Sequence, residues 1–231
     1  MIYKECYDMD NLQIEIYTPE CPGQVIYFFG PTDELDFPYD LLDERNAACV
    51  SITGMDWNKD LTPWKAPGLK PGDPDFGGEA DAFLKQLFFE IIPQAEESIE
   101  LMVDVEPDWT KHRYAAGISL GGLFAVYSLF RTDLFKKAAG ISASLWYDDF
   151  ISFTEKYQIY QEVDQVYLLL GEKEKQSKDP RMCQVEEKTS ALKDILLQKG
   201  VSCELEIVPG GHFSDAEERI TKVFAAILQE I

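Results

Sequence analysis

One serine lies in a pattern that suits nucleophilic chemistry. Residues 117–121 read Gly-Ile-Ser-Leu-Gly, with Ser119 at the centre and a further glycine at position 122. An apolar segment precedes this pattern and another follows it, which predicts a strand, a sharp turn and a helix. Side chains two residues either side of the serine would collide with neighbouring elements, so glycines suit this turn. The alternative interpretation is a strand that ends in a glycine-rich turn without any chemistry.

A serine hydroxyl needs a base, and the chain offers two histidines, His112 and His212. His112 precedes the predicted strand that leads to Ser119. Seven residues of extended chain span about 23 Å, so we expect His112 at the opposite end of the sheet, as a surface histidine. His212 follows the last predicted strand, and the carboxyl ends of parallel strands gather on one side of a sheet. Elimination therefore indicates His212 as the base, against the alternative of a solvent-exposed loop histidine.

A carboxylate would orient the imidazole of such a base. Glu172, Glu174 and Asp179 all follow the strand predicted at 165–170. Charged loop residues are often only solvated, so the residues alone leave these three candidates open. A pair of Ser119 and His212 without any acid is the remaining alternative.

The elements that must position these residues alternate along the chain. Apolar runs at 24–29 and 47–53 predict strands that are buried on both faces. Further strands are expected at 13–17, 113–118, 137–143, 165–170 and 202–208, and helices at 79–99, 120–130, 148–160, 181–199 and from 214 onward. Pro93 is expected to kink or end the first part of its helix. The pattern predicts the α/β class, with a mostly parallel central sheet and helices on both faces.

One segment fits no regular element. Residues 55–78 are rich in proline and glycine, and irregular segments of this length tend to be lids or binding loops. We therefore expect one domain over residues 1–231 with a lid-like insertion at about 55–78.

The charge balance excludes several kinds of partner. The chain has 21 Lys and Arg against 42 Asp and Glu, a formal net charge of −21. Such a chain repels phosphate backbones and anionic lipid headgroups, so we expect no nucleic acid and no membrane as partners. The five cysteines form no C-x-x-C pair. Without a signal-peptide pattern or an apolar run of about 18 residues, we expect a cytoplasmic protein.

Several segments together give the chain a family resemblance. They are residues 56–57, 63–64, 75–78, 117–123, 142–146 (Ser-Ala-Ser-Leu-Trp), 171–174 and 211–212. The chain resembles the α/β-hydrolase-fold esterases of the esterase D and enterochelin (ferric siderophore) esterase group. The resemblance implies Ser119 as nucleophile, His212 as base and a carboxylate after Gly171. Related hydrolases commonly place this acid three residues after the glycine, which favours Glu174 and leaves Glu172 in reserve.

The oxyanion hole departs from the family pattern. We expect the backbone N–H of Leu120 to be one donor. Many hydrolases carry His-Gly after the strand that supplies the second donor, whereas this chain has Phe-Gly-Pro-Thr at 29–32. Proline has no N–H, so Thr32 is the predicted second donor. Trp57, Trp64 and Trp146 are predicted to line the substrate pocket.

These residues predict a serine hydrolase of the carboxylesterase type, which cleaves a small-molecule ester through an acyl-enzyme and needs no metal or organic cofactor. An acyltransferase, a thioesterase or a peptidase would use the same site. A non-catalytic binding protein with the hydrolase fold is an alternative of a different class. The sequence fixes neither the natural substrate nor the oligomeric state, and it allows a homo-oligomer.

Overall fold

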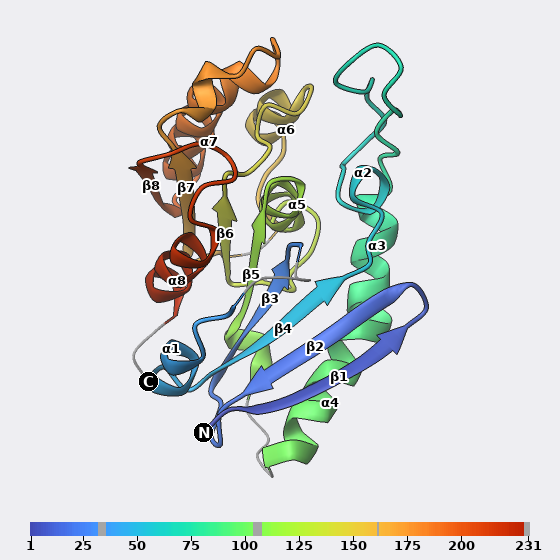
Figure 1. The fold of residues 1–231 in the computed structure, drawn as a ribbon, viewed down its shortest axis with the longest axis vertical. Helices are drawn as coiled ribbons and strands as arrows, with labels where there is room; N and C mark the ends of the chain where they lie inside the picture. The colour runs from blue at the N-terminus through green and yellow to red at the C-terminus, as the bar shows by residue number, and fades with distance from the viewer. Residues whose placement is uncertain (32–35, 104–107, 161, 229–231) are drawn as a thin grey trace.

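A single eight-stranded sheet organises the chain, in the order β1-β2-β4-β3-β5-β6-β7-β8 (Figure 1). The structure is a computed structural model that describes residues 1–31, 36–103, 108–160 and 162–228. The strands are β1 (Tyr3–Met9), β2 (Leu12–Thr18), β3 (Gln24–Phe29), β4 (Ala47–Thr53), β5 (Arg113–Ile118), β6 (Lys137–Ile141), β7 (Gln165–Gly171) and β8 (Ser202–Val208). β2 pairs antiparallel with β1 and with β4, and every other pairing is parallel. The predicted mostly parallel sheet is confirmed.

Helices pack on both faces of this sheet. They are α1 (Tyr39–Glu44), α2 (Trp57–Asp60), α3 (Ala80–Gln86), α4 (Ile92–Val103), α5 (Leu120–Ser128), α6 (Phe150–Lys156), α7 (Val185–Gln198) and α8 (Ala216–Ile227). The side chains of β3 alternate between two cores: Val25 and Phe29 belong to the core under α3 to α7, whereas Ile26 and Phe28 face α1 and α8. A strand that is buried on both sides needs apolar residues at nearly every position, which is why 24–29 is apolar after Gln24. The buried Gln24 side chain donates to the Arg45 carbonyl.

Several parts of the fold differ from the sequence prediction. The short helices α1 and α2 were not expected, and α2 lies inside the segment 55–78 that was expected to hold no regular element. β1 was not expected, because it is an edge strand whose residues are mostly exposed or half-buried and so lack a regular apolar face. The helix predicted at 79–99 consists of α3, a π-helical turn at Leu87–Ile91 and α4, which contains Pro93 and extends to Val103. A π turn shifts the hydrogen-bond register at a point where proline has no N–H to donate, so the helix continues past Pro93.

Element ends differ where single residues take a left-handed backbone. β6 was expected to reach residue 143 but ends at Ile141, since Ser142 has a φ of 48°. The last helix begins at Ala216 rather than at 214, after Asp215 with a φ of 50°. The hydroxyl of Ser214 accepts the backbone N–H of Gly211. The other predicted helices, at 120–130, 148–160 and 181–199, also extend beyond the observed ones.

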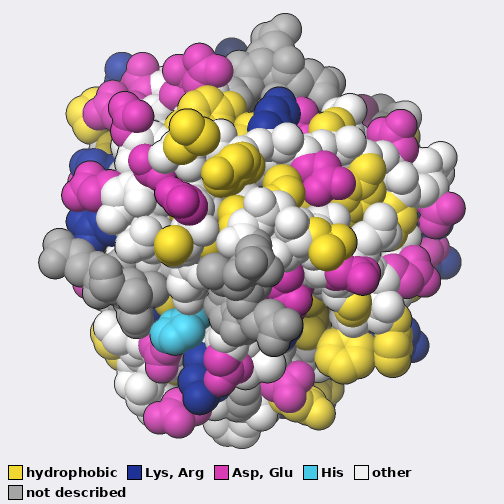
Figure 2. All heavy atoms as spheres, turned by 90° about the horizontal axis from the view of Figure 1, so that it is seen from below, with side chains coloured by type: hydrophobic (Ala, Val, Ile, Leu, Met, Phe, Trp, Pro, Cys, Tyr) yellow, Lys and Arg dark blue, Asp and Glu magenta, His cyan; other side chains and the backbone are white. Residues whose placement is uncertain are grey.

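The surface carries the acidic excess in scattered form. Figure 2 shows Asp and Glu side chains spread among apolar and neutral atoms on the face seen from below, with no block of Lys and Arg among the described residues. In the part of the chain that the structure describes, no helix is long and apolar enough to cross a bilayer.

The turn between β5 and α5 brings backbone unusually close to β3. A Cβ on Gly121 would lie 2.0 Å from the carbonyl oxygen of Phe29, and a Cβ on Gly117 would lie 2.4 Å from the carbonyl carbon of Gly121. Both obstacles are backbone atoms, which cannot move without moving the strand or the helix. The glycines at these positions are therefore required by packing.

We predict that Gly121→Ala lowers the free energy of unfolding by about 3 kcal/mol, because the added methyl must push α5 away from β3. Urea unfolding followed by circular dichroism measures the change. Gly211→Ala is the matched control, since a Cβ there meets nothing within 4 Å. Equal urea midpoints for the two variants would contradict the steric argument.

Candidate active site

Ser119 occupies a strained turn at the end of β5. Its φ is 55° and its ψ is −118°, and it directly precedes α5. The turn is held from both sides: Ser119 N–H donates to the Ile141 carbonyl at 3.0 Å, and the Ser144 N–H donates to the Ser119 carbonyl at 2.9 Å. A non-glycine residue keeps a positive φ only where its surroundings enforce it, and such strain concentrates at functional sites. The expected strand, turn and helix are present here.

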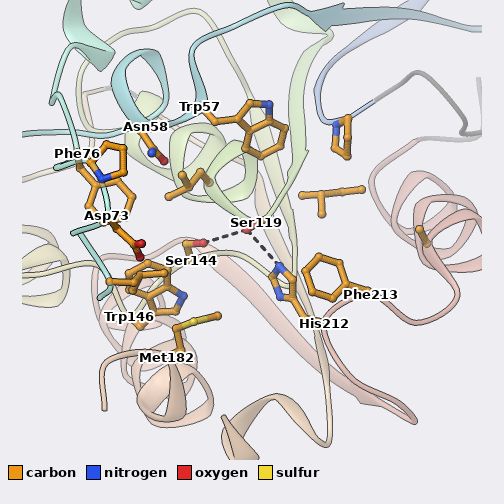
Figure 3. A pocket seen from close by; sticks show the side chains of 16 residues that line it. Trp57, Asn58, Asp73, Phe76, Ser119, Ser144, Trp146, Met182, His212 and Phe213 are labelled. Carbon is orange, nitrogen blue, oxygen red and sulfur yellow. Dashed lines mark hydrogen bonds between the residues drawn. The ribbon is translucent and has the colours of Figure 1, made fainter. Parts of the chain in front are cut away.

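Three polar side chains form a continuous hydrogen-bonded chain. Nε2 of His212 lies 3.2 Å from Oγ of Ser119 (Figure 3). On the other side of the ring, Nδ1 lies 2.9 Å from Oε2 of Glu174. With the proton on Nδ1 donated to the carboxylate, Nε2 is an acceptor for the serine hydroxyl. This geometry suits proton transfer from Ser119 to His212.

Glu174 is a buried carboxylate with several donors. The residue is 9% exposed, and its Oε1 accepts the Gly171 N–H at 2.8 Å and the Ser142 hydroxyl at 2.6 Å. Burial by itself raises the pKa of this carboxyl, but the hydrogen bonds from His212, Ser142 and Gly171 outweigh that cost and hold its pKa below the usual range. Glu174 is therefore ionised at neutral pH.

An arginine on α8 completes the surroundings of this carboxylate. Nη1 of Arg219 donates to Oγ of Ser142 at 3.1 Å and lies 3.7 Å from Oε1 of Glu174. Nη2 donates to the Pro209 carbonyl at 3.0 Å. Sequence reasoning missed both Arg219 and Ser142. A signal did exist for the arginine, because Arg219 lies four residues before Val223 and eight before Ile227, on the apolar face of its helix. A buried cation there needs a partner.

The other carboxylates considered do not contact His212. Glu172 is exposed, and Asp179 accepts the backbone N–H groups of Arg181 and Met182 at 2.8 and 3.0 Å. Asp179 thus holds the backbone that leads into the 3-10 turn Met182–Gln184. Among the three candidates, the structure brings Glu174 to the imidazole, and its catalytic role stays a prediction.

His112 lies at the start of β5, whereas Ser119 follows its end. It is half-buried rather than a surface residue, and its Nδ1 is buried without a hydrogen-bond partner among the described residues. Its carbonyl accepts the Val25 N–H, so the residue joins the beginning of β5 to β3. The imidazole is thus partly covered where these strands begin, and it lies at the other end of β5 from Ser119, as expected.

The two predicted oxyanion donors have different outcomes. Leu120 is the first residue of α5, and the first N–H groups of a helix have no acceptor inside it. Its N–H is therefore suited to an oxyanion beside Ser119. Thr32 lies in 32–35, outside the described residues, so its role stays a prediction. Ser144 adds a hydroxyl that the sequence did not single out, with its Oγ 3.2 Å from Oγ of Ser119.

Ser119 and His212 open into a cavity of about 570 Å³. Trp57 and Trp146 line this cavity as predicted, but Trp64 does not. The indole N–H of Trp64 instead donates to the Asp148 carbonyl at 3.0 Å. This contact fixes the irregular segment 55–78 to the loop after β6.

The same segment supplies much of the cavity wall. Its lining residues are Trp57, Asn58, Leu69, Asp73, Pro74 and Phe76. Its function as a lid stays a prediction. Within the described ranges, no three His, Cys, Asp or Glu side chains lie close enough together to hold a metal ion.

Comparison with known sequences gives limited matches. No family model matches the chain. A curated relative, "Uncharacterized protein YbbA" of Bacillus subtilis (strain 168), is 28% identical over 142 residues, which are 61% of this chain and 55% of that protein. The chain thus matches over about half of the length of that relative.

Comparison with solved structures extends over nearly the whole chain. An IroE-like serine hydrolase from Shewanella oneidensis has a TM-score of 0.77 at 18% identity, covering 99% of this chain and 80% of its own. The enterobactin hydrolase IroE in complex with DFP has a TM-score of 0.72 at 20% identity, covering 99% and 96%. The siderophore hydrolase EstA from Aspergillus nidulans has a TM-score of 0.69 at 17% identity, covering 98% and 93%. The chain has the α/β-hydrolase fold. The resemblance to siderophore and enterochelin esterases is confirmed at the level of structure.

The α/β-hydrolase fold accounts for the positions of the three residues. In this fold a nucleophile, an acid and a histidine follow one another along the chain. Here Ser119 follows β5, Glu174 follows β7 and His212 follows β8. Their contact depends on parallel strands that all end at one edge of the sheet.

We predict that the Glu174 carboxylate contributes pH-dependent stability. Its pKa is lower in the folded chain than the value of about 4.3 expected when unfolded. The contribution is therefore fully present above that unfolded value and is lost as the pH falls through the lower folded pKa. Glu174→Gln should lower the free energy of unfolding at pH 7 by roughly 1–3 kcal/mol. The difference in unfolding free energy between the variant and the unmodified chain should become smaller below about pH 4.

Urea unfolding between about pH 3 and pH 7 checks this expectation. Glu172→Gln serves as the control, because that carboxylate is exposed and should show no such gap. A Glu174→Gln deficit that stays constant over the whole pH range would contradict the assigned ionisation.

Proposed function

We propose that the chain is a serine esterase that hydrolyses a small-molecule ester through an acyl-enzyme. The observation that carries this proposal is the hydrogen-bonded chain from Glu174 through His212 to Ser119, which ends in an apolar cavity. A hydroxyl joined to an imidazole, with a carboxylate on the far nitrogen, is the arrangement that activates serine in unrelated hydrolases.

The reaction follows from the direction of these contacts. Oγ of Ser119 attacks the ester carbonyl carbon while its proton moves to Nε2 of His212. The carbonyl oxygen becomes an oxyanion, which accepts the Leu120 N–H and, as a second donor, the Thr32 N–H. Collapse of this intermediate breaks the bond to the alcohol oxygen, and His212 returns the proton to that oxygen. Water then repeats both steps on the acyl-enzyme and releases the acid.

The ionised Glu174 sets the protonation of the His212 ring. Its carboxylate accepts the Nδ1 proton, which keeps Nε2 unprotonated before the attack and stabilises the imidazolium after it. The lowered pKa of Glu174 supports this role, because a protonated acid could not offset the positive ring. Ser142 and Arg219 hold the carboxylate in place from behind.

The names of the similar structures support hydrolysis as the class of reaction. Their names describe a serine hydrolase, an enterobactin hydrolase and a siderophore hydrolase. For this chain the proposal is limited to ester hydrolysis, with the insertion at about 55–78 acting as a lid over the cavity. A binding protein without activity is disfavoured, since it would not need the proton-transfer geometry at Ser119.

We predict that Ser119→Ala abolishes hydrolysis of p-nitrophenyl acetate and leaves the fold intact. Loss of the nucleophile of a triad costs on the order of 10⁶ in kcat. Release of p-nitrophenolate measures activity, and circular dichroism measures folding. Activity of the variant within tenfold of the unmodified chain would rule out Ser119 as nucleophile.

We predict opposite outcomes for the two histidines. His212→Ala should be nearly as damaging as loss of the serine, because no other base lies within hydrogen-bond distance of Ser119 among the described residues. His112→Ala should change kcat by less than about threefold, since it lies at the other end of β5. Should His112→Ala abolish turnover while His212→Ala retains it, the proposed base is wrong.

A further inference from the structure

The cavity extends to one side of the serine, away from the histidine. Figure 3 shows Asp73 and Phe76 on the side of Ser119 opposite to His212 and Phe213. If the proposed esterase reaction holds, the leaving alcohol oxygen takes its proton from His212 and so departs on the histidine side. The acyl group then occupies the side of the cavity that holds Asp73.

This acyl side contains a carboxylate and no cation. Apart from His212, Asp73 is the titratable side chain that lines the cavity within the described ranges, and neither Lys nor Arg lines it there. Residues 32–35, which adjoin the lining residue Pro31, include no Lys or Arg in sequence either. Asp73 is exposed, accepts the Lys70 N–H at 3.1 Å and forms no ion pair with another described residue. Solvent screens part of its negative charge, but no described cation offsets that charge at the cavity wall.

The nearest guanidinium on this side does not supply the missing positive charge. Arg181 stacks 5.6 Å from the ring centroid of Trp146 and 5.8 Å from that of Phe76. Its Nη1 donates to Asp148 at 2.8 Å, and its Nη2 donates to the Pro67 carbonyl. The charge of Arg181 is thus paired outside the cavity.

We propose that the acyl side of the cavity selects apolar acyl groups that are neutral or cationic, and that Asp73 rejects anionic ones. The aromatic rings of Trp57, Phe76 and Trp146 provide apolar walls. A carboxylate at the end of an acyl chain would instead meet Asp73 and the field of a chain with net charge −21. This selectivity rests on the proposed esterase activity and adds a charge preference to it.

Three p-nitrophenyl esters with one leaving group test the proposal: the hexanoate, the 6-(trimethylammonio)hexanoate and the adipate monoester. The expected kcat/KM for the cationic ester exceeds that for the anionic one by at least about fivefold, because Asp73 attracts one and repels the other. Asp73→Asn should reduce this ratio by about fivefold and keep one oxygen to accept the Lys70 N–H. Raising the salt to about 0.5 M should shrink the effect in the unmodified chain.

Asp75→Asn is the matched control. Asp75, two residues away, is an exposed carboxylate like Asp73 and accepts the Gly68 N–H, but it does not line the cavity. Its replacement makes the same change in net charge and should leave the ratio within about twofold, because it lies outside the site.

The outcomes separate the two proposals. If all three esters are hydrolysed with similar kcat/KM, or if Asp73→Asn keeps the ratio of the unmodified chain, the charge selectivity is wrong and the esterase activity stands. If Asp75→Asn lowers the cationic-to-anionic ratio of kcat/KM as much as Asp73→Asn does, the role of Asp73 is also overturned. If none of the esters is hydrolysed, the esterase proposal fails, and the selectivity fails with it.

Discussion

A buried negative charge on Glu174 constrains the arrangement of the whole carboxyl edge of the sheet. Burying a carboxylate costs free energy unless donors surround it. Here the donors come from three places: the Gly171 N–H at the end of β7, the Ser142 hydroxyl after β6 and the His212 ring after β8. The Arg219 guanidinium on α8 adds a positive charge 3.7 Å from the carboxylate. These groups meet only if β6, β7 and β8 keep their parallel register, in which Ile141 pairs with Leu169 and the end of β7 pairs with the end of β8. The buried carboxylate is therefore stabilised only in the same strand register that brings Ser119, Glu174 and His212 together.

The strained turn at Ser119 depends on the same edge. Ile141, the last residue of β6, accepts the Ser119 N–H, and the next two residues lead to Ser144, whose N–H and hydroxyl both contact Ser119. The loop after β6 therefore holds the nucleophile through Ser144 and the acid through Ser142. Neither contact is local in sequence, since Ser119 and Ser144 are 25 residues apart. One short loop can in this way keep Ser119 and Glu174 at the spacing that a single imidazole spans.

The parts that the sequence predicted well are those with strong local signals. The runs at 24–29 and 47–53 became β3 and β4 with the expected bounds, because strands buried on both faces are apolar at most positions. The glycine pattern located the turn at Ser119 because backbone contacts there exclude a Cβ. Contacts between distant segments left weaker traces. Ser142 lay in a segment that carries the family resemblance, but nothing in the sequence indicated its hydrogen bond to Glu174. The residues alone did not separate the carboxylates at 172, 174 and 179, and only the resemblance favoured Glu174. Trp64 was assigned to the pocket by its type, whereas its indole N–H bonds to the loop after β6.

If Ser119 is activated through His212, it forms a covalent bond to an electrophile that enters the cavity. Reaction of the folded chain with a fluorophosphonate, followed by mass spectrometry of its peptides, detects that bond. We expect one phosphonyl group per chain, carried by Ser119, and much slower labelling when His212 is replaced. Ser119 is not the nucleophile if the chain takes up no phosphonyl group or carries it on another residue.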